Sequence, residues 1–244
     1  MTTNLETEAG KVRLSAKKTK VMLVGEVEVL QPITVHGQNV DHVDRFTYLG
    51  SILTCDSDAE ADVNCRIGKA VSVFQRMRSI WSLSLISTDT KIWLYKAIVM
   101  SVGIFASETW KITTKNVQKL NVFHQRCLRK ILHVTCREHV TNEEVLMRTG
   151  SRKLAYTVTE CSFLLTGHIL RLPSHRPSKV AISWTPDDGK RRGCPKKTWR
   201  RTFQEDLTRA NISWKEAEHT AMDRPLWRQA AAQCPTGTGG NMSK

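Results

Sequence analysis

Short apolar runs with the spacing of β-strands mark the first 54 residues of the 244-residue chain. Residues 21–24 form a continuous apolar run, residues 31–36 alternate loosely, and Gly37-Gln38 is typical of a turn. A further strand is indicated by Phe46, Tyr48, Leu49, Ile52 and Leu53. We therefore predict a small antiparallel meander, which buries too little surface to be stable alone and needs a larger partner.

From Ser57 onward the apolar spacing becomes helical. Ser57 and Glu60 have the spacing of a capping box. A five-turn apolar stripe follows: Val63, Ile67, Ala70, Val71, Phe74, Met77 and Trp81. A second helix is predicted over residues 89–107, which are apolar nearly all round, so we expect it at the buried centre of a bundle.

Three more segments of the bundle follow the same spacing. A third helix is predicted over residues 116–133, with an inward face of Leu120, Phe123, Cys127, Leu128 and Ile131. Thr141 and Glu144 cap a short helix that Gly150 closes. A fifth helix ends at Pro173 and has the stripe Leu154, Val158, Cys161, Leu165, His168, Ile169 and Leu172. We interpret His168 as a core residue.

The last part of the chain is predicted to be a loop followed by helices. Residues 174–188 contain Pro177 and Pro186 and are interpreted as a loop or linker. Ser213 and Glu216 cap a helix with Trp214, Ala217 and Ala221, and another helix surrounds Trp227. Residues 235–244 have the composition of a disordered tail.

These patterns predict a mainly α chain with a small antiparallel β remnant at its N-terminus, an α+β class overall. The expected parts are the strands (1–54), a helical bundle (55–172), a Pro-rich and basic linker (173–192), a basic helical module (193–234) and the tail (235–244).

The charge of the chain indicates a polyanionic partner. The formal net charge is +14, and residues 151–244 hold 17 of the 37 basic residues but only 8 of the 23 acidic ones. Basic residues are densest in residues 189–201: Lys190, Arg191, Arg192, Lys196, Lys197, Arg200 and Arg201. We call these seven residues the basic tract.

The basic tract is expected to change character midway. Residues 189–193 are typical of a flexible loop, and Pro195 suits a first helical residue. Trp199, Phe203, Leu207 and Ala210 then form an apolar stripe. Lysines at a helix N-terminus oppose the macrodipole, so we interpret the tract as a phosphate-binding surface. The alternative is a solvated basic face.

Other chemistry is poorly supported by the sequence. Cys127, His133, Cys136 and His139 lack the spacing of a zinc knuckle, and no cluster has the pattern of a catalytic site. The longest apolar run, residues 97–106, is too short to span a bilayer. We therefore expect no cofactor and no membrane partner. The seven cysteines, an odd number with no C-x-x-C pair, favour reduced thiols and a nuclear or cytoplasmic location.

An ordered series of motifs resembles the C-terminal part of the reverse transcriptases of non-LTR (LINE-type) retrotransposons. The series covers nearly the whole chain: residues 18–22, 43–51, 66–70, 107–110, 123–131, 166–169 and 193–201, then Asp223-Arg224 and Trp227-Arg228. Each motif is moderately specific, and their order is the stronger signal.

The resemblance implies functions for several segments. Residues 18–22 resemble the strand that closes the polymerase palm, and residues 46–51 resemble the primer-grip hairpin, which adds Lys18, Lys20, Tyr48 and Gly50 to the candidate nucleic-acid contacts. Residues 59–131 resemble the thumb, and the remainder resembles the C-terminal nucleic-acid-binding extension. The implied partners are RNA and DNA, and a polymerase core supplied in trans is a further candidate partner.

One departure from the family bears on activity. The Tyr/Phe-Ala-Asp-Asp motif that should precede Leu5 is absent from this sequence, and two-metal polymerisation needs that carboxylate pair. Cys194 also stands where the family commonly has arginine, and residues 104–106 depart from its pattern. We expect a truncated, non-polymerising fragment, with Mg²⁺ needed only by a full-length enzyme. The alternatives are an incomplete gene model of an active endonuclease/reverse transcriptase and a helical protein–protein scaffold.

Overall fold

The structure, a computed structural model, describes residue 15 and residues 18–23, 33–35, 37–56, 58–184 and 198–233. The expected helix cap Ser57, residues 185–197 and the expected tail 235–244 lie outside these residues. Helices make up most of the described chain and strands are few and short, which confirms the predicted mainly α composition. The chain divides into two compact units, Met1–Asn64 and Cys65–Lys244, which we describe in turn.

The described residues of the first unit form three two-stranded sheets. Its strands are β1 (Lys20–Val21), β2 (Thr34–Val35), β3 (Gln38–Asn39), β4 (Asp41–His42), β5 (Arg45–Tyr48) and β6 (Ser51–Thr54). The pairs β2–β3 and β5–β6 are antiparallel hairpins. The single strand predicted over residues 46–53 is wrong, because the chain turns at Leu49-Gly50, where the family resemblance implied a hairpin. The predicted meander is also wrong for β1, which pairs in parallel with β4, because the β2–β3 hairpin intervenes and returns the chain in the same direction.

The strand unit also includes the beginning of α2 (Glu60–Arg76). The Asp58 carboxylate accepts a hydrogen bond from the Glu60 amide at 3.2 Å. Within the first turn of the helix, the buried Asp62 carboxylate accepts a hydrogen bond from the Ile52 amide of β6 at 3.0 Å. These carboxylates therefore fix the start of α2 and join it to the last strand.

The second unit is helical, and its element order fits the predicted series. Its further helices are α3 (Arg78–Ser82), α4 (Thr88–Leu94), the π-helix η1 (Tyr95–Met100), α5 (Ser101–Gly103), the 3₁₀ turn η2 (Ser107–Thr109), α6 (Thr114–Ile131), the 3₁₀ turn η3 (Cys136–Glu138), α7 (Asn142–Arg148), α8 (Leu154–Leu170), α9 (Pro177–Ser183), α10 (Trp199–Arg209), α11 (Trp214–Thr220) and α12 (Arg224–Gln233).

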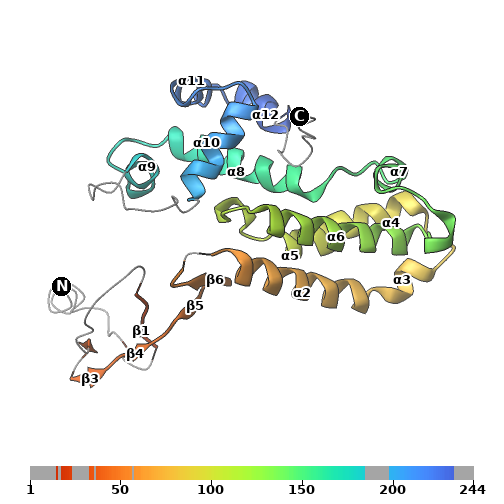
Figure 1. Ribbon diagram of the computed structural model, residues 1–244, viewed down its shortest axis with the longest axis horizontal. Helices are drawn as coiled ribbons and strands as arrows, with labels where there is room; N and C mark the ends of the chain where they lie inside the picture. The colour runs from red at the N-terminus through yellow and green to blue at the C-terminus, as the bar shows by residue number, and fades with distance from the viewer. Residues whose placement is uncertain are drawn as a thin grey trace, which may run out of the picture. The chain divides into compact units, whose positions relative to one another are not determined.

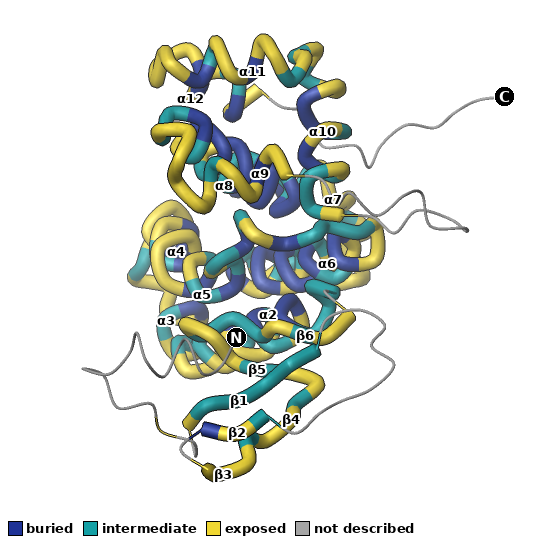
Figure 2. Tube along the Cα trace, turned by 90° about the vertical axis from the view of Figure 1, so that its left-hand side faces the viewer, coloured by how far each residue is buried: buried dark blue, intermediate teal, exposed yellow. Residues whose placement is uncertain are grey.

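Helix α6 is central to this unit. Figures 1 and 2 show it between α8 on one side and α3 with the body of α2 on the other. Its buried residues include the whole predicted inward face, and they appear as the dark band along α6 in Figure 2. A regular 3.6-residue stripe was enough to predict this helix and its orientation.

The continuous segment α4–η1–α5 is not the fully buried centre that its apolar composition predicts. Ile92, Tyr95 and Val99 are buried, whereas the exposed fractions of Trp93 and Ile98 are 65% and 39%. The neighbouring helices cover only one side of the segment, so its other apolar side stays exposed. The π-helical stretch is a local departure from α geometry that apolar composition does not indicate.

The buried face of α8 also differs from the predicted stripe. His168 is exposed, so its interpretation as a core residue is wrong, whereas the polar or small residues Thr159, Ser162, Thr166 and Gly167 are buried. Helix α8 contacts α6 as well as α11 and α12. Small side chains let α8 pack closely against helices on both of its sides. A search for a stripe of large apolar residues does not identify such small buried positions.

Helices α8 and α10–α12 share one hydrophobic core. Its buried members are Phe163, Leu170, Phe203, Leu207, Ala217, Ala221, Trp227 and Ala231. The expected bundle and C-terminal module are thus packed together through α8. The segment expected to be a loop also contains helix α9, which Pro177 starts and whose Ile182 is buried.

Candidate nucleic-acid interface

The helix that carries the end of the basic tract begins later than predicted. Thr198 has an extended backbone, and its hydroxyl accepts a hydrogen bond from the Arg201 amide at 3.2 Å. Thr198 is therefore the N-cap and Trp199 the first residue of α10, later than predicted; Pro195, the predicted first helical residue, lies outside the described residues. A threonine hydroxyl satisfies an otherwise unpaired amide at a helix start, an advantage that proline lacks.

The apolar stripe of α10 is confirmed and anchors this helix. Phe203 and Leu207 are buried, and Trp199 and Ala210 pack against the same core. The Trp199 ring stacks on Phe203 with centroids 5.5 Å apart and planes 2° from parallel. Its indole N–H donates to the Glu108 carbonyl at 2.9 Å. Trp199 is thus fixed within the protein by packing and by a hydrogen bond.

Five of the seven residues of the basic tract, Lys190, Arg191, Arg192, Lys196 and Lys197, lie outside the described residues. Arg200 joins the described residues on either side of this segment. Its Nη1 donates to the carbonyl oxygens of Ser183 at 3.1 Å and Trp184 at 3.3 Å, at the end of α9. Its guanidinium also lies 5.4 Å from the ring centre of Trp214. We call this set of contacts the Arg200 clasp.

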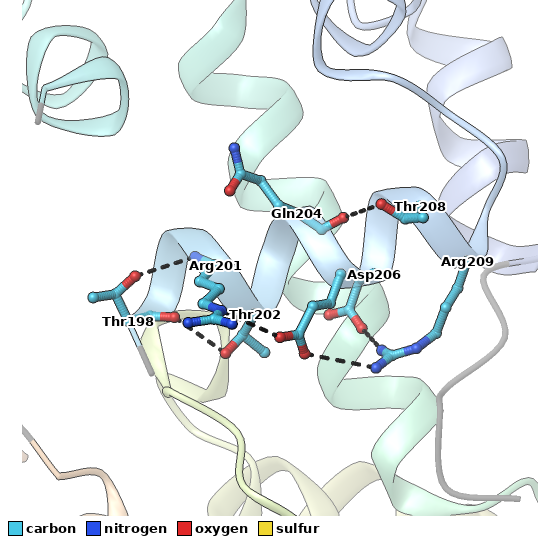
Figure 3. A network of polar contacts seen from close by, with 8 residues as sticks. Thr198, Arg201, Thr202, Gln204, Asp206, Thr208 and Arg209 are labelled. Atoms are coloured by element: carbon cyan, nitrogen blue, oxygen red, sulfur yellow. Dashed lines mark hydrogen bonds and ion pairs between the residues drawn. The ribbon is translucent and has the colours of Figure 1, made fainter. Parts of the chain in front are cut away.

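Arg201, the neighbour of Arg200, is exposed and differently paired (Figure 3). Its Nε lies 3.8 Å from a Glu205 oxygen, and the other Glu205 oxygen lies 3.8 Å from Arg209. Asp206 pairs with Arg209 at 2.5 Å. The Arg201–Glu205 pair is long and solvent-accessible, and such pairs are weak, about 0–1 kcal/mol, so Arg201 can exchange Glu205 for a phosphate at low cost.

The first unit contains the four other candidate residues. Lys18 is exposed in a turn, whereas Lys20 forms an ion pair with Asp41 across the β1–β4 pair. The hydrogen bond from Lys20, followed by its charge, lowers the pKa of the Asp41 carboxyl. Lys20 therefore has an acidic partner of its own, and a phosphate would have to compete with it.

Tyr48 and Gly50 lie together at the tip of the β5–β6 hairpin. The two turn residues Leu49 and Gly50 both have positive φ, 48° and 86°, as a type I′ turn requires. Tyr48 and Leu49 are 59% and 80% exposed. The expected hairpin is thus present, with an aromatic and an aliphatic side chain at its exposed tip.

A pocket that the sequence did not predict lies between α8 and α12. Its lining residues are Leu164, His168, Arg171, Arg224, Trp227 and Arg228. The signal was present in the spacing, since Arg224 and Arg228 are one helical turn apart and His168 and Arg171 nearly so. It was missed because no sequence pattern indicates that α8 and α12 lie side by side.

The sequence analysis disfavoured a zinc site at Cys127, His133, Cys136 and His139, and the described structure forms no such group from them. Across the described ranges, no three His, Cys, Asp or Glu residues are grouped so that they could hold a metal ion. Cys127 is buried, as predicted, and burial raises the pKa of its thiol to about 12. A cysteine binds metal as the thiolate, which this environment disfavours.

Within the described part of the chain, no helix is both long and apolar enough to cross a membrane. Comparisons with protein-family models, curated proteins and solved structures find no match to this chain. The functional argument therefore depends on the residues themselves and on the motif series described above.

Proposed function

We propose that this chain binds RNA or DNA through phosphate contacts of the basic-tract residues other than Arg200, as the C-terminal nucleic-acid-binding part of a reverse transcriptase of the non-LTR retrotransposon type. The observation that carries the proposal is the Arg200 clasp, which bonds the end of α9 to the first turn of α10. Five basic residues, Lys190, Arg191, Arg192, Lys196 and Lys197, lie between these two points in the sequence.

The anchoring of α10 supports this proposal. Trp199 and Phe203 attach the helix to the shared core, so the end of the tract is held by a folded domain. Restricting where a binding segment starts and ends lowers the entropy lost when it binds. Arg201, a member of the tract on α10, is also available for a phosphate, because its ion pair with Glu205 is weak.

The same proposal assigns no polymerase activity to this chain. Templated synthesis needs paired carboxylates that hold two metal ions, and the motif that supplies them in the family is absent from the sequence. A primer-extension assay with Mg²⁺ and nucleotides is expected to give no product above the heat-treated control. Heat-sensitive incorporation would favour the alternative of an active enzyme.

The salt dependence of binding tests the nucleic-acid proposal. Replacing Lys190, Arg191, Arg192, Lys196 and Lys197 with Gln should reduce the slope of log K against log salt by about 4.5 on duplex DNA and about 3.5 on single strands. The affinity should fall similarly for nucleic acids of unrelated sequence, because phosphate contacts fix the position of the nucleic acid but do not recognise its bases.

A variant with the same change in charge is the control. Five exposed basic residues outside the tract, Lys69, Arg76, Arg126, Lys130 and Arg137, are changed to Gln. This control should keep nearly the wild-type slope. If the tract variant keeps the wild-type slope, or if both variants lose it equally, the tract is a solvated face and the proposal fails.

A further inference from the structure

The pocket between α8 and α12 has a volume of about 350 Å³. Helix α8 and its C-cap contribute Leu164, His168 and Arg171, and α12 contributes Arg224, Trp227 and Arg228. The pocket therefore brings together three guanidinium groups and an imidazole from segments more than 50 residues apart. Its volume is within the range of sites for small ligands, about 300–1,000 Å³.

The charges around the pocket are unbalanced. None of the described residues that line it is acidic. The nearest acids in the sequence have other partners: the Asp223 carboxylate accepts from the Leu226 amide at 3.0 Å, and Glu160 forms an ion pair with Arg152. The three arginines thus face one another without a carboxylate in the pocket wall.

Hydrogen bonds and close packing hold the two walls in place. Arg171 Nη1 donates to the Ala221 carbonyl at 2.7 Å, just before α12. The buried Trp227 indole donates to the Phe163 carbonyl of α8 at 2.7 Å. Partial desolvation, and then the charges of Arg224 and Arg228, lower the pKa of Arg171. An arginine remains charged in proteins, so the repulsion persists until an anion enters.

We propose that this pocket is a phosphate-binding site, in which Arg224 and Arg228 on α12 face Arg171 and His168 across a bound phosphate group. Guanidinium groups bind phosphate oxygens in a bidentate manner, and three of them converge here. The phosphate belongs either to a nucleic-acid backbone or to a free phosphate compound such as a nucleotide. The site shares no residue with the basic tract, so it is a second, independent anion site.

The test compares pyrophosphate with a short single-stranded oligonucleotide as probes, using calorimetry on the whole chain. In the double variant Arg224→Gln, Arg228→Gln, pyrophosphate affinity should fall at least tenfold if the site takes free phosphate compounds. If it takes backbone phosphates, the variant should instead reduce the salt slope for the oligonucleotide by roughly 1.4. Either result supports the site and identifies the source of the phosphate.

Matched variants complete the test. Arg126→Gln together with Arg176→Gln removes the same charge from exposed positions outside the pocket and should leave both probes bound as in the wild type. Arg224→Lys with Arg228→Lys should keep the oligonucleotide salt slope but weaken pyrophosphate binding, because lysine lacks the planar fork. Circular dichroism checks that the double Gln variant is folded. If this folded variant binds both probes with the same affinity as the control variant, the proposal is overturned. The five-residue tract variant should still bind pyrophosphate. The experiments can therefore disprove the proposal for one site without affecting the proposal for the other.

Discussion

Gly167 of α8 lies directly against the indole of Trp227 on α12. A β-carbon built on Gly167 would lie 2.1 Å from the indole nitrogen, far closer than atoms can approach. The indole cannot easily move away, because it is 1% exposed and its N–H donates to the Phe163 carbonyl at 2.7 Å. The absence of a side chain at this position therefore determines how closely the two pocket helices pack.

Gly167→Ala should destabilise the protein by about 1–3 kcal/mol through overpacking. The loss is measured as a lower midpoint in thermal or urea unfolding. Gly68→Ala in α2 is the matched control, since no atom other than its chain neighbours and the adjacent helix backbone lies within 4 Å of a β-carbon there. That change should stabilise the helix by about 0.5–1 kcal/mol, because alanine is the better helix former. Equal effects at the two sites would contradict the packing argument.

Trp199 should contribute mainly to stability. Its ring stacks on Phe203 and its N–H bonds to Glu108, so Trp199→Ala should cost about 2–4 kcal/mol in unfolding. Trp199→Phe keeps a ring but removes the hydrogen bond, and should cost about 1 kcal/mol. An unchanged melting temperature in Trp199→Ala, with weaker single-strand binding, would instead identify the ring as a base-stacking platform.

Local patterns predicted the helices that are buried on one face. The stripes of α6 and α10 and the cap at Ser213 follow from spacing and side-chain chemistry alone, and all three are confirmed. The prediction was wrong where burial depends on neighbours. Trp93 is exposed because only one side of its helix is covered, and His168 because α8 is buried through its small residues.

The candidate site was only partly predictable for the same reason. The charge of the basic tract is visible in the sequence. The contacts of Arg200 with α9 were not predictable, because the proline content of this segment led to the prediction of a loop in place of the helix. The arginine pocket requires α8 and α12 to be neighbours, and their contact is made by a glycine and a tryptophan 60 positions apart. No pattern within either helix specifies that pairing.

His124 should make the stability of the protein depend on pH. Burial lowers its pKa to about 4, opposed by the nearby Arg152 backbone and assisted by the charge of Lys96. In the unfolded chain its pKa is about 6.5. Between these values the unfolded state binds a proton that the folded state does not, so stability falls as the pH is lowered from about 6.5 to about 4, by roughly 3 kcal/mol in total.

The measurement is the free energy of unfolding at several pH values. His124→Gln should have a shallower dependence than the wild type between pH 4 and 6.5, although it also loses the 2.8 Å hydrogen bond with Tyr95 and is less stable throughout. His175→Gln, at an exposed position, is the matched control. Parallel curves for wild type and His124→Gln would show that this histidine is not the source of the dependence.

Arg200 and Arg201 are adjacent in the sequence, but substitutions at the two positions should have different effects. Comparing them distinguishes a side chain that stabilises the fold from one that binds phosphate. Arg200 bonds two carbonyl oxygens and lies over Trp214, and lysine lacks the fork for this arrangement. Arg200→Lys should therefore destabilise the protein by about 1–2 kcal/mol, and neither it nor Arg200→Gln should change the salt slope of nucleic-acid binding. Arg201→Gln should leave the melting temperature unchanged and reduce the slope by about 0.9 on duplex DNA. The reverse pattern, with a reduced slope in Arg200→Gln and none in Arg201→Gln, would mean that Arg200 leaves the clasp to bind phosphate.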